Sequence, residues 1–114
     1  MIIGITAIAL LSVSPAPVED WRKINLGGET IEIDKASIRD EGQGQRAFRA
    51  RIAIDASTVM VSDNVMACAA GAMEMRKMET ISGGRVTKTQ QFAAGERRRI
   101  LDESGDAIVT LVCG

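Results

Sequence analysis

The two cysteines, Cys68 and Cys113, are the side chains whose chemistry most narrows the function of this 114-residue chain. The sequence has no His and no CxxC motif, so a thiolate nucleophile would lack its usual base and the common dithiol site is absent. An even cysteine count in a small exported chain indicates a disulfide. The bridge would close a loop of about 45 residues, for which chain entropy predicts about 4 kcal/mol of stabilisation. A Cys-dependent enzyme, or two free thiols in a cytosolic chain, are the alternatives.

Arginine is the second chemical signal, because it accounts for ten of the fourteen basic residues. Guanidinium groups bind carboxylate, phosphate or sulfate in a bidentate manner. Arg49 and Arg51 share one face of a predicted strand, and Arg97, Arg98 and Arg99 could extend that face. These five residues have two interpretations. They could form a binding face for an acidic glycan or a protein surface at the cell envelope, or they could belong to a solvated strand face balanced by glutamates. We favour the solvated face, because exposed charged faces are common.

The composition argues against several other functions. The chain has no Tyr, 3% aromatic residues and a formal net charge of −1, which does not favour nucleic-acid binding or a sugar-binding cleft. The acidic cluster of Asp102, Glu103 and Asp106 lacks the spacing of a calcium loop, and we interpret it as a solvated turn. We therefore predict no cofactor, no metal site and no enzymatic activity.

Trp21 and a group of methionines have two interpretations. They could form a pliable binding surface, but such residues more often fill gaps in a core. We favour the core interpretation. The methionines concerned are Met60, Met66, Met73, Met75 and Met78.

The first 18 residues contain no charged side chain. An apolar run of about a dozen residues precedes small residues and Pro15, which is typical of a secretory signal peptide and is too short to span a membrane. We predict a signal peptide over residues 1–18 and no membrane span after its removal. No Lys or Arg precedes the run, so an upstream start stays open. A buried N-terminal strand or helix is the alternative.

Alternating apolar and polar residues predict short strands over residues 21–26, 29–34, 46–55 and 85–92. The dipeptides Gly27-Gly28 and Gly83-Gly84 predict hairpin turns. Asp34 is expected to cap a turn over residues 35–38, and residues 39–45 are expected to form a polar turn. Residues 56–64 are interpreted as a connection.

Two segments are ambiguous. The composition of residues 65–80 favours a helix, but a long strand bent at Gly71 also fits. Residues 107–113 have apolar side chains at helical spacing, with Ser104 as the expected N-cap, although their β-branched content also permits a strand.

Several short motifs occur in a characteristic order: WRKI at Trp21, IEIDKASI from residue 31, a cysteine at position 68, a GG turn, and a cysteine next to the last residue. In this order residues 19–114 resemble the surface-adhesin protein E-like family of small exported bacterial proteins. The resemblance implies an α+β fold, mainly an antiparallel β-sheet with a short C-terminal helix tethered to the sheet by the Cys68–Cys113 disulfide. It also implies that residues 65–80 are extended.

From these features we expect a single domain over residues 19–114, exported to the periplasm or cell surface, that acts as a non-enzymatic, adhesin-like binding module. A periplasmic accessory protein or inhibitor that caps another envelope protein, through a sheet edge or the arginine face, is the alternative.

Overall fold

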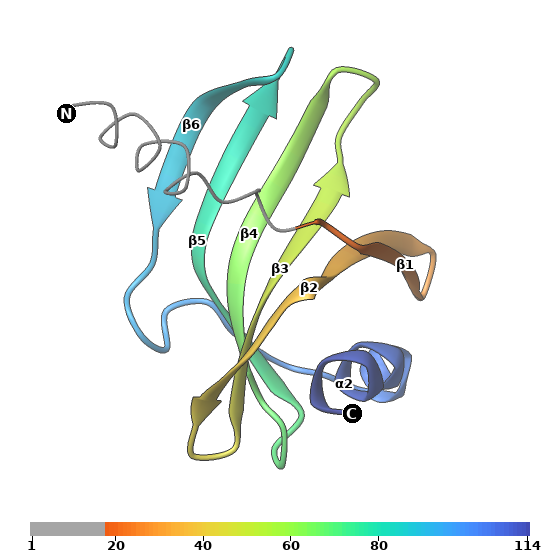
Figure 1. Ribbon diagram of the computed structural model, residues 1–114, viewed down its shortest axis with the longest axis vertical. Coiled ribbons are helices and arrows are strands. Elements are labelled where there is room, and N and C mark those ends of the chain that lie inside the picture. Colours follow the sequence, from red (N-terminus) through yellow and green to blue (C-terminus); the bar gives the residue numbers. More distant parts are fainter. Residues whose placement is uncertain (1–17) are drawn as a thin grey trace, which may run out of the picture.

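The computed structural model describes residues 18–114, which form one antiparallel sheet and a short C-terminal helix (Figure 1). The sheet order is β1 to β6 in sequence, and β7 pairs with the part of β5 that β6 leaves free. This confirms the predicted fold class. The elements are β1 Trp21–Leu26, β2 Glu29–Gly42, β3 Gln45–Ala53, β4 Thr58–Ala67, β5 Ala72–Ser82, β6 Arg85–Gln91, β7 Arg98–Ile100, the 3-10 helix η1 Glu103–Gly105 and α2 Asp106–Cys113.

The two predicted glycine hairpins are confirmed. Gly27 and Gly28 join β1 to β2 with φ of 55° and 99°, and Gly83 and Gly84 join β5 to β6 with φ of 56° and 77°. Two consecutive positive φ values match the twist of the flanking strands, and glycine adopts them without a steric cost.

The helical interpretation of residues 65–80 is wrong, and so is the interpretation of 56–64 as a connection. Residues 58–67 form β4, a turn follows, and β5 begins at Ala72. Gly71 lies in that turn with φ of 61°, so it separates two strands instead of bending one. Pairing of β4 with both β3 and β5, together with complete burial of Met66, outweighs the helix propensity of the Ala- and Met-rich composition.

The expected turn over residues 35–38 is also wrong, because β2 continues to Gly42 across a shift in register after Asp34. The Asp34 carboxylate is 3% exposed, and its Oδ1 accepts hydrogen bonds from the backbone N–H of Asp20 (2.8 Å) and of Ala36 (3.1 Å). Asp34 therefore stabilises an irregularity within a strand and the start of β1 together. The polar turn is shorter than expected and lies at Gln43 and Gly44.

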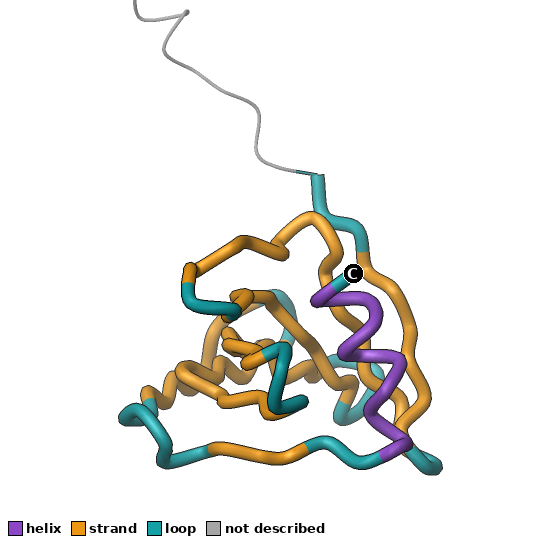
Figure 2. Tube along the Cα trace, turned by 90° about the horizontal axis from the view of Figure 1, so that it is seen from below, coloured by secondary structure: helices purple, strands orange, loops and turns teal. Residues whose placement is uncertain are grey.

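The main core lies between α2 and one side of the curved sheet (Figure 2). Ile108 and Val112 of α2 are 0% and 1% exposed and pack against apolar side chains of the first four strands. The buried strand residues of this cluster are Ile24, Ile31, Ile33, Phe48, Ala50 and Met66.

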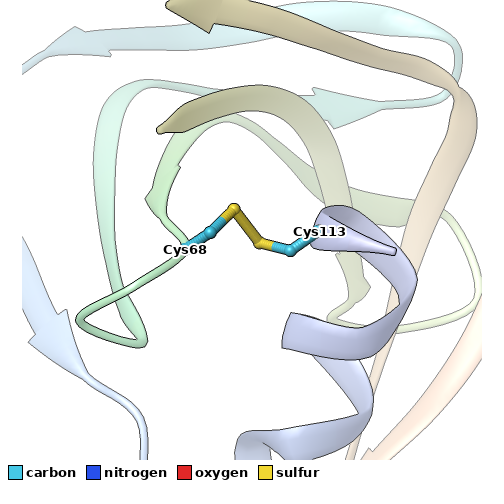
Figure 3. The surroundings of a disulfide bond; sticks show 2 residues. All are labelled: Cys68 and Cys113. Carbon is cyan, nitrogen blue, oxygen red and sulfur yellow. A yellow bond between two sulfur atoms is a disulfide. The ribbon is translucent and has the colours of Figure 1, made fainter. Parts of the chain in front are cut away.

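The predicted disulfide joins Cys68, in the turn after β4, to Cys113 at the end of α2 (Figure 3). Their Cα atoms are 5.9 Å apart. An isolated helix of eight residues is not stable in water, so α2 depends on its packing and on this bond.

The start of the C-terminal helical segment differs from the prediction that Ser104 is its N-cap. Asp102 caps η1, because its Oδ1 accepts hydrogen bonds from the Ser104 backbone N–H (3.0 Å) and hydroxyl (2.6 Å). The N-cap of α2 is Gly105, which makes no side-chain cap.

At eight residues, α2 is far shorter than the roughly 20 residues that a membrane-spanning helix needs, and no other helix within residues 18–114 is long enough. Apart from Val18, the predicted signal peptide lies outside the described residues.

Candidate binding face

Strand alternation places Arg49 and Arg51 on the side of the sheet opposite α2. Their neighbours in β3, Phe48 and Ala50, are buried in the core that α2 covers. Across the register, Arg49 is paired with Asp34 and Asp63, and Arg51 with Glu32. We call the side-chain set of Trp21, Glu32, Arg49, Arg51 and Asp63 the arginine face.

Arg51 is held in a fixed geometry. Its Nε and Nη2 donate to the two carboxylate oxygens of Glu32 at 3.2 and 3.3 Å, a bidentate pair. Its guanidinium carbon also lies 4.1 Å from the centroid of the Trp21 ring. Because Glu32 pairs with its charge and Trp21 covers its planar surface, Arg51 holds these two side chains in place and is not a free cation for a ligand.

Arg49 is held more loosely. Its Nη1 lies 3.5 Å from Glu19 Oε2, its Nε lies 3.9 Å from Asp63 Oδ1, and its guanidinium carbon lies 5.9 Å from the Trp21 centroid. The side chain is 41% exposed. Exposed pairs with long distances contribute little to stability, so Arg49 can exchange these carboxylates for those of a partner.

A hollow of about 1090 Å³ lies beside Arg49. It extends from the start of the described chain across β2, β3 and β4 to Arg76 and Glu79 of β5. Charged side chains of both signs line it: Arg39, Arg49 and Arg76, with Glu19, Asp34, Glu41, Asp63 and Glu79. Since carboxylates outnumber guanidinium groups, the hollow favours a ligand of mixed charge over a polyanion.

The structure does not bring all five predicted arginines together. β4 and β5 separate β7 from β3. Arg98 is opposite Glu74 of β5 and Arg99 is opposite Met73. Arg97 precedes β7, and its guanidinium carbon lies 4.9 Å from the Phe92 ring centroid.

Glu74 is the anionic centre of this second basic region. The hydrogen bond from the Gly95 backbone N–H holds the pKa of the Glu74 carboxyl below its ordinary value, and the charges of Arg76 and Arg98 act in the same direction. The loop before β7 is thereby fixed to β5, so these contacts position the loop.

Sequence reasoning missed three contributors to the arginine face and hollow. Trp21 supplies the surface on which Arg51 stacks, whereas the favoured interpretation of the sequence puts Trp21 in the core. Its indole Nε1 is buried without a hydrogen-bond partner among residues 18–114. Its place in the alternating WRKINL strand was the available signal. Arg39 and Arg76 line the hollow, but each lies beside an irregularity in its strand, which breaks the two-residue period.

The sulfur atoms of both cysteines are in the disulfide, so no cysteine is a free thiol here. Within residues 18–114, no three acidic or cysteine side chains converge on a position that could hold a metal ion. No protein-family model, curated protein or solved structure matches this chain.

Proposed function

We propose that this chain is a non-enzymatic, exported binding module of the bacterial envelope or surface, adhesin-like in role, that binds a protein partner through the arginine face and the adjoining hollow. The observation that carries the proposal is the charged hollow beside a half-exposed Arg49, on the side of the sheet that α2 does not cover.

The disulfide supports the exported location, because such bonds persist in oxidising compartments and are rare in the cytosol. It also removes the thiol that a Cys-dependent enzyme would need.

The distribution of charge supports a protein partner more than an acidic glycan. A polyanion would have to displace Glu19 and Asp63 from Arg49 and would meet the remaining carboxylates of the hollow. A protein surface with both Lys or Arg and Asp or Glu side chains can instead satisfy both signs.

The first experiment tests export and the bond together. The intact mass of the natively exported chain, measured with and without reduction, should show loss of the N-terminal segment and a gain of two hydrogens on reduction. An unprocessed chain inside the cell with two alkylatable thiols would remove the basis of the proposal.

The second experiment tests the face. The oxidised protein is titrated against purified extracellular-matrix proteins, envelope proteins and heparin, and then compared with an Arg39→Glu/Arg76→Glu variant. An Arg85→Glu/Lys88→Glu variant, on the other side of the sheet, is the matched control for charge. We expect a protein partner whose affinity falls at least about tenfold in the first variant only. Binding of heparin alone, or of no probe, would contradict the proposal.

The accessory-protein alternative shares this face and differs in the partner. This alternative is favoured if the partner whose binding is weakened in the Arg39→Glu/Arg76→Glu variant is another protein of the same envelope.

A further inference from the structure

The helix α2 covers only one end of the sheet against which it packs, because its axis runs across the long direction of the strands (Figures 1 and 2). A helix is about 10 Å wide, whereas the 11 residues of β5 extend about 36 Å. In Figure 1, α2 lies at the end of the sheet where the disulfide is, and the far ends of β3 to β6 project beyond it. About 20 Å of strand length therefore has no helical layer on this side.

Apolar side chains occupy the uncovered half on the same side as the core. Ile52 follows Phe48 and Ala50 in alternation, and its cross-strand partner is Met60. Met78 is opposite Ser62, which is opposite Ala50, so it also lies on this side. We call Ile52, Ile54, Met60 and Met78 the methionine face.

The methionine face is only partly covered. Its three strand residues are intermediate in burial, and Ile54 is 54% exposed. Met66, the second-last residue of β4, is by contrast fully buried under α2. The expectation that the methionines fill the core therefore holds for Met66 and not for Met60 or Met78. Partly exposed methionines form adaptable docking surfaces for apolar side chains.

Two cations border the methionine face along β6, the last strand in the sheet order. Lys88 is opposite Thr80 of β5, and Thr80 is in turn opposite Met60 of β4. Arg85 is opposite Ser82. Both are exposed, and neither has an acidic group within ion-pair distance in the described part of the chain. β6 itself carries no acidic residue.

These observations favour a partner that combines apolar and acidic side chains. A second copy of this chain would bring the same two cations to this surface, and like charges repel. An amphipathic helix about 10 Å wide fits the uncovered length, and its acidic flank would reach Arg85 and Lys88.

We propose that the methionine face docks an acidic amphipathic helix of another protein, which lies beyond α2 as a second helix on the same side of the sheet. This surface is separate from the arginine face, so the inference does not rest on the proposed function.

Two synthetic peptide probes test the inference with the oxidised protein. One is an amphipathic helix of about five turns with Leu at helical spacing and Glu on its flanks, and the other has Lys in place of Glu. Fluorescence anisotropy of the labelled peptides reports binding. We expect the acidic peptide to bind, the basic peptide to bind at least about tenfold more weakly, and added salt to narrow the difference.

Two variants locate the site. Arg85→Glu/Lys88→Glu should reverse the preference for the acidic peptide, and Met60→Ser/Met78→Ser should weaken its binding while the far-UV spectrum stays unchanged. The Arg39→Glu/Arg76→Glu variant carries the same charge change on the other side and should bind as the wild type does.

Several results would overturn the inference. The first is that the acidic peptide does not bind, and the second is that both peptides bind equally well. The third is that affinity for the acidic peptide falls equally in Arg85→Glu/Lys88→Glu and in Arg39→Glu/Arg76→Glu. Sedimentation showing a dimer that Met60→Ser/Met78→Ser dissociates would identify a second copy as the occupant instead.

Discussion

Removal of the disulfide should destabilise the protein through two separate effects. The change is Cys68→Ala/Cys113→Ala. The bridge spans a sequence separation of 45 residues, so the chain-entropy relation predicts a loss of about 4 kcal/mol as the unfolded chain gains freedom. The second effect is local, because the bond fixes α2, whose Ile108 and Val112 cover the core.

Urea unfolding measured by far-UV circular dichroism checks this prediction. We expect the free energy of unfolding to fall by about 2–5 kcal/mol and the denaturant slope to rise, since an unbridged denatured chain exposes more surface. Hydrogen exchange should show that α2 amides lose protection before those of β3 and β4.

A control separates packing from chain entropy. Ile108→Ala in the oxidised protein should cost about 2–4 kcal/mol without a rise in the denaturant slope. A loss below about 1 kcal/mol in the double cysteine variant, with α2 still protected, would refute the reasoning. If that variant does not fold, the loss exceeds the whole free energy of unfolding, which is about 5 kcal/mol or more for a typical domain, and therefore exceeds the predicted loss of about 2–5 kcal/mol.

Three further predictions concern single side chains. The pKa of Glu74 is below its ordinary value of 4.5, chiefly because of the hydrogen bond from the Gly95 N–H, so the folded state binds fewer protons than the unfolded state. The contribution of Glu74 to the free energy of unfolding is therefore present above about pH 4.5 and is lost as the pH falls through the lower pKa of the folded state. Glu74→Gln should therefore flatten the acid branch of a urea-midpoint profile, and an unchanged branch would contradict this. Gly105→Ala would place a Cβ 2.7 Å from Leu101 Cβ, so thermal unfolding should show a loss of about 1–3 kcal/mol; Ser104→Ala, the control at an exposed position, should cost less. Arg51→Lys removes the bidentate pair with Glu32 and the stacking on Trp21, so it should cost about 1 kcal/mol and change the emission of this only tryptophan; an unaltered spectrum would count against the contact.

Local patterns in the sequence determined much of the fold. Alternation in residues 46–55 predicted β3 and the side on which Arg49 and Arg51 lie, and both glycine pairs predicted their hairpins. These features depend on neighbours within a few residues, so the chain itself carries the information. The disulfide was predictable from the even cysteine count together with the predicted signal peptide.

Tertiary structure alone decided the features that depend on distant residues. The composition of residues 65–80 favours a helix, and only the pairing of residues 65–67 with β3 and of residues 72–80 with β4 makes these two parts extended. Likewise, the sequence shows Arg51 as a cation, whereas cross-strand register brings Glu32 and Trp21 to it and largely neutralises it. Register between strands is a long-range property: it sets which charges meet, and hence which cations remain for a partner.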